Sequence, residues 1–481
     1  MNDSGLRNRT MSSILWRFAE RCGAQGVSFA VSVVLARLLA PDVYGTIALV
    51  SVFITILQVF VDSGMANSLI QKKDADDIDF STVFYFNIIV CFILYCVMFI
   101  AAPVISAFYE DKELIPIIRV LSLTLLISGI KNVQQAYISR NLLFKRFFFA
   151  TLGGTIGAAI IGITLAYLGY GVWALVAQQL FNATVDTIIL WISVKWRPKR
   201  VFSLERLKAL FSYGWKLLAS GLLDTVYNNI RQLVIGKMYS PSDLAFYNKG
   251  QQMPSLIITN INASIDSVLL PVMSREQRDS MRVKDMTRRA IKTSTYIIAP
   301  MMVGLTAVAP TIINILFTEK WLSSVPFLRI FCIIYLFYPI QTANLNAIKA
   351  LGRSDLFLKL EIIKKSLGFG LLVSTMWYGV MAMAYSLLIN CFLGQIINSW
   401  PNRKLLKYSY LEQLKDILPG IVLAVIMGVC VSAISLMPIQ VPEILLLVIQ
   451  IVVGFAIYVI GSEISRNDSY MYLKNTIKSY F

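Results

Sequence analysis

Histidine is absent from all 481 residues, and acidic residues are few, with 27 Asp and Glu against 44 Lys and Arg. The absence of histidine excludes His-based metal sites and imidazole proton relays, so any proton coupling has to use Asp or Glu. The sequence also lacks a G-x-x-x-x-G-K-[ST] phosphate loop, which excludes an ATP-driven pump within this chain. No metal site and no cofactor is predicted.

Charge of either sign is scarce: charged residues make up 15% of the chain, hydrophobic residues 57%, and the mean hydropathy is +0.67. A soluble surface would not tolerate this composition, so the sequence predicts a polytopic membrane protein. A transmembrane helix needs about 20 mostly apolar residues. By that measure the chain holds fourteen predicted spans: 13–39, 43–66, 81–106, 114–137, 148–169, 171–194, 209–238, 243–269, 291–316, 323–348, 356–378, 380–400, 413–437 and 441–463.

Basic residues are distributed unevenly between the two sets of connections. One side, which includes both termini, carries 29 Lys and Arg, whereas the other side carries Lys112 and Lys320. Short cytoplasmic loops retain positive charge, so both termini are predicted to be cytoplasmic. The net charge of +17 then reflects orientation and attraction to anionic lipid, and no nucleic-acid partner is expected. The outer connections are too short for a catalytic domain.

Two pairs of similar segments indicate an internal repeat. LARLLAPDVYG (35–45) resembles IGKMYSPSDLA (235–245) at an offset of 200, and LIPIIRVLS (114–122) resembles SVPFLRIFC (324–332) at an offset of 210. Corresponding elements are six spans apart, an even number, so the repeats have the same orientation in the membrane.

The predicted fold is therefore an all-α integral membrane protein of fourteen transmembrane helices, with two parallel-repeat six-helix lobes around a central cavity and two C-terminal helices. The predicted domains are an N-lobe (1–200), a C-lobe (201–402) and a C-terminal region (403–481).

Polar residues recur at helical spacing in the first span of each lobe. The first span carries Arg17, Arg21, Gln25, Ser28 and Ser32, and the seventh carries Lys216, Ser220, Asp224, Asn228 and Arg231. Steps of three or four residues place each set on one helical face. A charge at the bilayer centre costs about 2.5–3.5 kcal/mol, so both faces are expected to meet each other or water.

Two interpretations of these faces stay open. Glu20 beside Arg17 and Arg21, and Asp224 near Arg231, are able to form pairs that only hold helices together. Cations nevertheless outnumber anions on the two faces. Such an excess favours an anionic substrate, and the guanidinium fork of Arg suits phosphate.

Further intramembrane polar residues are candidates for the same cavity or for its gates. Lys249 is predicted to line the outer half of the cavity as a substrate contact. Possible coupling or gate residues are Glu20, Asp62, Lys131, Glu361 and Lys364. For Lys131, a side chain that reaches the interface is an equal alternative.

Several stretches of the chain resemble the Wzx-type polysaccharide or O-antigen flippases, with the colanic-acid exporter-like branch most similar. They are ARLLAPDVYGTIALV (36–50), VDSGMANSLIQKKD (61–74), AFYNKGQQ (245–252), FTEKWLSSVPFLRIFC (317–332) and KALGR (349–353). The resemblance implies a bacterial inner-membrane member of the multidrug/oligosaccharidyl-lipid/polysaccharide exporter superfamily. It also implies a flippase that moves an undecaprenyl-diphosphate-linked oligosaccharide to the outer leaflet for exopolysaccharide or O-antigen biosynthesis.

The expected partners are this lipid-linked glycan and the phospholipid bilayer, and a polysaccharide polymerase or export machinery stays open as a further partner. The expected protein is a transporter that works by alternating access, not an enzyme. Two alternatives remain: a multidrug or organic-ion exporter of the same superfamily, and a membrane polymerase or ligase of lipid-linked sugars. The cation excess disfavours the first, and the short outer loops disfavour the second.

Overall fold

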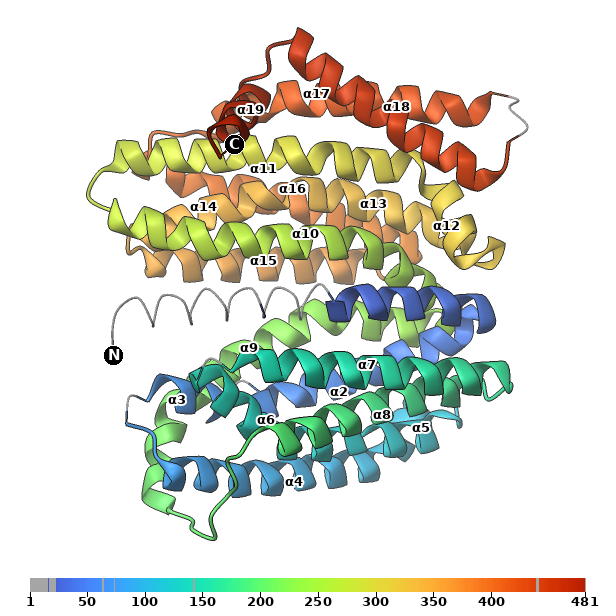
Figure 1. Cartoon of the computed structure of the whole chain (residues 1–481), viewed down its shortest axis with the longest axis vertical. Helices are drawn as coiled ribbons and strands as arrows, with labels where there is room; N and C mark the ends of the chain where they lie inside the picture. The colour runs from blue at the N-terminus through green and yellow to red at the C-terminus, as the bar shows by residue number, and fades with distance from the viewer. Residues whose placement is uncertain are drawn as a thin grey trace. The chain divides into compact units, whose positions relative to one another are not determined.

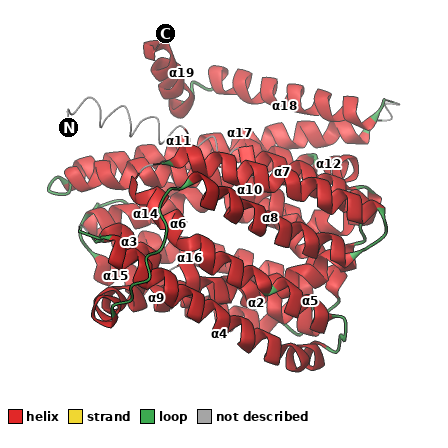
Figure 2. Cartoon of the chain, turned by 60° about the horizontal axis from the view of Figure 1, so that its bottom comes forward, coloured by secondary structure: helices red, strands yellow, loops and turns green. Residues whose placement is uncertain are grey.

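The computed structural model describes residues 16, 23–62, 65–72, 74–141, 143–437 and 441–480, and every regular element in these ranges is a helix (Figure 2). Contacts divide the chain into two compact units, Met1–Ala245 and Phe246–Phe481. The predicted lobe boundary, at residue 200, falls elsewhere, before a helix that packs within the first unit. The repeat-based domains therefore stay a prediction.

The first helix with given bounds among the described residues of the first unit is Gly23–Leu38. The helices that follow are α2 (Pro41–Asp62), α3 (Met65–Gln71), α4 (Asp77–Tyr109), α5 (Leu114–Leu121), α6 (Leu123–Asn141), α7 (Phe144–Tyr167), α8 (Val172–Ser193) and α9 (Leu204–Met238). α7 and α8 run side by side, and α9 packs against α2, α3 and α4 (Figure 1). One hydrophobic core joins α3, α4, α6 and α8 through the fully buried side chains of Leu69, Val83, Val133 and Leu190. Burial of each such side chain stabilises the fold by roughly 1.5–3 kcal/mol.

α10 (Pro241–Arg275) begins in the first unit and continues into the second. The second unit continues with α11 (Ser280–Ala307), α12 (Ala309–Phe317), the short 3-10 helix η1 (Glu319–Ser324), α13 (Val325–Leu336), α14 (Tyr338–Ala350), α15 (Ser354–Thr375), α16 (Val380–Leu405), α17 (Tyr410–Leu436), α18 (Glu443–Ile464) and α19 (Asp468–Tyr480). α17 packs along α11 and α18, and α19 lies against α11 (Figure 1).

Ten helical segments among the described residues are long and apolar enough to cross a membrane, and an eleventh is the pair α11 and α12, bent by 71°. The chain is therefore a multi-pass membrane protein. Three predicted spans fall outside this set. They are the first span, of which the structure describes the helix Gly23–Leu38, then α9, which carries charges along its length, and α15, which carries charges between Asp355 and Lys365. The count of fourteen spans stays a prediction. α9 is the predicted span whose polar and charged side chains fit a membrane span least well.

A buried amide network attaches α17 to the rest of the second unit. The Asn344 amide donates to Gln413 Oε1 at 2.8 Å and to Ser399 Oγ at 3.2 Å, and the Asn402 amide donates to Asn344 Oδ1 at 2.7 Å. All four residues are fully buried. Buried polar groups in this position cost free energy unless they are paired, so the network fixes how α14, α16 and α17 meet.

One polar contact occurs in both units at the offsets of the sequence repeat. In the first unit the Asn132 amide of α6 donates to Asp62 Oδ1 of α2 at 2.8 Å. In the second unit the Asn262 amide of α10 donates to Thr342 Oγ1 of α14, also at 2.8 Å. Asp62 and Asn262 differ by 200 positions, and Asn132 and Thr342 differ by 210. Side chains at corresponding positions are thus hydrogen-bonded in both units, with the donor on the other helix of the pair in the second unit. The internal repeat stays a prediction.

Candidate functional site

The polar stripe of α9, which comprises Lys216, Ser220, Asp224, Asn228 and Arg231, is the central candidate site. The first four side chains are exposed and Arg231 is half-buried. The helix that carries them begins where Ser203 Oγ accepts the amide of Arg206 at 3.4 Å, a capping contact that satisfies one of the free amides of the first turn. The spacing of four and three residues then brings all five side chains to one face.

Lipid is an unsuitable neighbour for this face. Lys216 and Asn228 make no hydrogen bond or ion pair with other described residues, and both are exposed. A Lys or Asp at the centre of a bilayer costs roughly 2.5–3.5 kcal/mol on insertion scales. If α9 crosses the membrane as the sequence predicts, the polar stripe needs water or a polar ligand beside it, and its role as a substrate site stays a prediction.

The first predicted span contributes less to the described site. Arg17, Glu20 and Arg21 lie outside the described residues. Gln25 is half-buried on Gly23–Leu38, and Ser28, one turn further, is exposed. The expected meeting of this face with the polar stripe of α9 stays a prediction.

Lys249 lies deep inside the second unit, with 5% of its surface exposed. Its ammonium is 4.2 Å from the ring centroid of Phe317 and 5.3 Å from that of Trp321. Aromatic faces attract a cation in this geometry, which reduces the cost of burial. The structure thus places Lys249 among the rings of α12 and η1, and its substrate contact stays a prediction.

The predicted coupling and gate residues fall into three separate contacts. Asp62 accepts the Asn132 amide and, at 3.3 Å, the Gln58 amide. Glu361 pairs with Lys364 one turn along α15. Lys131 of α6 pairs with Asp186 of α8 at 3.0 Å, where the side chains are 20% and 11% exposed.

Asp186, the partner of Lys131, is not among the site residues predicted from the sequence, although the sequence contains one indication of this pair. A lone Lys in one apolar span and a lone Asp in another are each unfavourable, and together they form a neutral pair. The Lys131 ammonium therefore pairs with Asp186 inside the first unit, and its predicted role as a gate residue stays a prediction.

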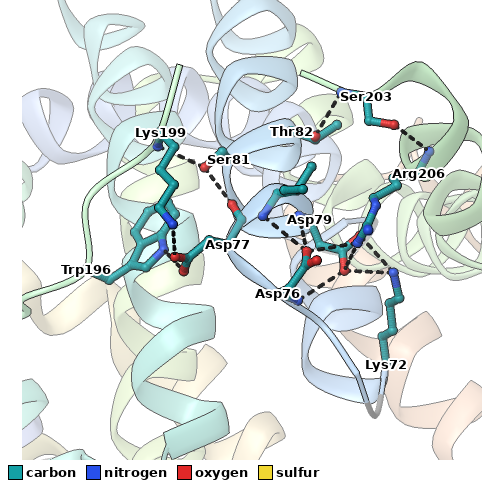
Figure 3. A network of polar contacts seen from close by, with 11 residues as sticks. Lys72, Asp76, Asp77, Asp79, Ser81, Thr82, Trp196, Lys199, Ser203 and Arg206 are labelled. Atoms are coloured by element: carbon teal, nitrogen blue, oxygen red, sulfur yellow. Dashed lines mark hydrogen bonds and ion pairs between the residues drawn. The ribbon is translucent and has the colours of Figure 1, made fainter. Parts of the chain in front are cut away.

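A charged clamp holds the start of α9 to the start of α4 (Figure 3). The side chain of Asp79 is fully buried and receives the Lys72 ammonium at 2.7 Å and the Arg206 guanidinium at 3.2 Å. Arg206 also reaches Asp76 at 2.8 Å. Asp76 in turn caps α4 by accepting the amides of Ile78 and Asp79. One carboxylate thus ties α9 to α4 and to the segment after α3.

The linker between α8 and α9 also contacts the first turns of α4, on the side that carries Asp77 and Ser81 (Figure 3). Trp196 Nε1 donates to Asp77 at 3.2 Å, and the Lys199 ammonium pairs with the same carboxylate at 2.7 Å. The Lys199 amide donates to Ser81 Oγ and the Ser203 amide to Thr82 Oγ1, at 2.9 and 3.1 Å. The linker is therefore fixed along its length before α9 begins.

The opposite end of α9 is held by a second set of contacts. Lys237 forms an ion pair of 2.9 Å with Glu110 and donates to the Phe108 carbonyl at 2.6 Å. Lys237 also lowers the pKa of the exposed Glu110 carboxyl by a charged hydrogen bond. A lowered pKa means that the pair is formed at neutral pH and is lost only when the pH falls below the ordinary carboxyl range.

Two glycines allow the helices to touch at this end. A Cβ on Gly45 of α2 would lie 1.8 Å from the Pro241 carbonyl oxygen, and a Cβ on Gly236 of α9 would lie 2.7 Å from Leu49 Cδ1. Gly45 belongs to the first copy of the repeated turn motif, and Gly236 and Pro241 belong to the second. The two copies of the motif therefore pack directly on each other, and we call this contact the turn contact.

Comparison with known proteins places these features in context. A family model described as "Polysaccharide biosynthesis protein" matches residues 34–326. The teichuronic acid biosynthesis protein TuaB of Bacillus subtilis (strain 168) is 24% identical over 388 residues, which is 79% of each chain. The lipopolysaccharide biosynthesis protein WzxC of Escherichia coli (strain K12) is 24% identical over 401 residues, 82% of this chain and 80% of the relative.

Solved structures show the same fold at low identity. A lipid II flippase MurJ in an inward closed conformation has a TM-score of 0.77 and 16% identity, over 95% of this chain and 99% of that chain. An inward-facing multidrug transporter of the MATE family has a TM-score of 0.63 and 17% identity, over 80% of this chain and 94% of that chain. The chain therefore shares the fold of these two proteins.

We expect Asp79→Asn to destabilise the chain by about 2 kcal/mol. The substitution keeps the shape of the side chain but removes the only buried carboxylate between Lys72 and Arg206, which are each about one-third exposed. The measurement is the thermal unfolding midpoint of the purified chain in detergent. Asp355→Asn, which removes an exposed pair with Arg353, is the control and should leave the midpoint unchanged. Equal midpoints for both variants would refute the clamp.

We expect Gly45→Ala to open the turn contact, because the added methyl group collides with backbone at Pro241. Cysteines at positions 110 and 237, joined by a short bifunctional thiol reagent, report whether this end is closed. The cross-linked yield should fall several-fold when Gly45→Ala is added. Gly370→Ala, where a Cβ meets nothing within 4 Å, should not change the yield. A yield that Gly45→Ala leaves intact would contradict the turn contact.

Proposed function

The chain belongs to the polysaccharide biosynthesis protein family, and on that basis we propose that it is a flippase for lipid-linked oligosaccharides. It moves an undecaprenyl-diphosphate-linked repeat unit from the inner to the outer leaflet of a bacterial inner membrane, with both termini in the cytoplasm. The observation that carries the proposal is the exposed polar stripe of α9, which crosses a predicted membrane span without the apolar surface that lipid requires.

The substrate chemistry matches the residues of the stripe. A diphosphate needs cations and hydrogen-bond donors, and the stripe offers Lys216, Asn228 and Arg231, with Arg17 and Arg21 as the predicted partners on the first span. Arg binds phosphate through two parallel N–H groups, which Lys cannot do. The polyprenyl tail has no polar group to satisfy, so it stays in lipid while the headgroup moves.

Alternating access in this proposal needs no covalent chemistry. The turn contact and the Lys237–Glu110 pair lie at the predicted outer end, and the Asp79 clamp lies at the predicted inner end. Exposed ion pairs contribute little to stability, whereas a buried carboxylate is expensive to leave unpaired. We infer that α9 separates at its outer end while its inner end stays attached.

The driving force for this cycle is available from the membrane potential. An inside-negative potential favours outward movement of an anion by about 2.3 kcal/mol per charge per 100 mV. Exchange with protons or other cations would use carboxylates such as Asp62 or Glu20, which are predicted coupling candidates, or Asp224 of the polar stripe.

We expect the double variant Lys216→Ala/Arg231→Ala to lower export of lipid-linked units at least tenfold, because it removes both cations of the polar stripe. The assay is polysaccharide production in a strain that lacks its own flippase. Arg278→Ala, which removes an exposed arginine of the loop between α10 and α11, is the matched control with unchanged export. Full export by the double variant, at wild-type protein level, would overturn the proposed role.

A further inference from the structure

Two neighbouring cavities lie in the second unit where α11, α17 and α19 meet. The larger has a volume of about 530 Å³ and an apolar wall from α17, which includes Leu418 and Val422. The smaller, about 250 Å³, is lined mainly by charged residues of α11 and by the start of α19. Lys292, Asp468 and Ser469 line both cavities. We call the combined depression the C-terminal groove.

Part of the charge in the C-terminal groove is already neutralised. The Arg288 guanidinium pairs with Asp416 at 2.6 Å, and the Lys292 ammonium pairs with Asp468 at 2.8 Å. These two bridges tie α11 to α17 and to α19. Arg288 and Lys292 are two of the four cationic side chains in the walls, and the other two are Arg289 and Arg466.

The remaining charge is positive. Arg289 and Arg466 have no carboxylate within ion-pair distance among the described residues, and the Arg289 guanidinium lies over the ring of Tyr472 at 5.0 Å. Asp285 is the remaining carboxylate of the groove. After the two bridges are formed, the groove therefore presents two guanidinium groups against one carboxylate. This balance favours a ligand with a single negative charge.

The apolar part of the groove has the dimensions of a hydrocarbon chain. Leu418, Val422 and Ile426 recur every four residues on α17 and are 56%, 47% and 50% exposed. At 1.5 Å per residue this stripe extends about 12 Å along the helix. An apolar stripe that starts beside charged groups matches an acyl chain attached to a headgroup.

The order of the two parts matches the orientation of a membrane lipid. On α11, basic residues are frequent up to Lys292, and from Thr293 the helix carries no further charged residue. The charged part of the groove thus lies at the water boundary on the predicted cytoplasmic side. The apolar part lies on the bilayer side of that boundary.

We propose that the C-terminal groove binds one anionic phospholipid from the inner leaflet. Arg289 and Arg466 supply the charge for its phosphate, and the stripe of Leu418, Val422 and Ile426 receives one acyl chain. This lipid bridges α11, α17 and α19 within the second unit. The site is separate from the polar stripe of α9 and does not depend on the proposed flippase activity.

The test is native mass spectrometry of the purified full chain with phosphatidylglycerol or zwitterionic phosphatidylcholine. We expect preferential binding of one phosphatidylglycerol. Each basic side chain near an anionic headgroup contributes roughly fivefold in affinity, so Arg289→Gln/Arg466→Gln should weaken binding about 25-fold. Arg403→Gln, an exposed arginine outside both cavities, is the control. Leu418→Gln/Val422→Gln should also weaken binding, because the acyl chain loses its wall.

Four results would overturn the proposal. They are equal binding of the two phospholipids, unchanged phosphatidylglycerol binding in the double arginine variant, complete displacement by millimolar inorganic phosphate, and displacement by undecaprenyl phosphate at a lower concentration than phosphatidylglycerol itself. The third result would indicate a free-anion site, and the fourth a site for the polyprenyl substrate. Because none of these measurements depends on transport, failure here leaves the flippase proposal unaffected.

Discussion

The cost of placing charge in a hydrocarbon layer is the constraint on which the rest of this structure depends. Three charged side chains of the predicted spans reduce this cost through a partner. Lys131 pairs with Asp186, Lys249 lies on aromatic rings, and Asp62 accepts the Asn132 amide. Lys216 of the polar stripe does not follow this pattern, since its side chain is exposed and makes no ion pair with other described residues. A membrane protein retains such a surface only where water or a polar ligand covers it.

The two ends of α9 are held by different physical means, and this difference gives the helix a direction of movement in the proposed cycle. At the predicted inner end, Asp79 is fully buried between Lys72 and Arg206. At the predicted outer end, the contact consists of an exposed ion pair and of backbone packed closely at Gly45. Separation at the Gly45 end exposes no buried charge, so it costs less than separation at the Asp79 end.

Local patterns in the sequence predicted much of the architecture. The apolar runs predicted a multi-pass helical protein, which the structure confirms, and the motifs at residues 36–50 and 317–332 predicted the family, which the comparisons confirm. Four-residue spacing also predicts that Lys216 and Asp224 share a face, because a helix has a fixed period. Local patterns of this kind depend only on neighbouring residues.

Contacts between distant residues were not predictable in the same way. Arg206 and Asp79 lie far apart in the sequence, and only the packing of α9 on α4 brings them together. The same holds for Asp186, which pairs with Lys131 from another helix. The C-terminal groove is a further case, since its walls come from α11, α17, α19 and the turn before α19, whose arrangement no local pattern specifies.

The exposure of the α9 stripe to water is the central claim, and thiol labelling in membranes tests it most directly. In a background without native cysteines, Asn228→Cys should react with a charged, water-soluble maleimide, because the reactive thiolate forms only in water. Ile451→Cys, on the apolar and exposed surface of α18, should react only with a membrane-soluble reagent. If Asn228→Cys behaved like Ile451→Cys, the stripe would face lipid and the account would be wrong.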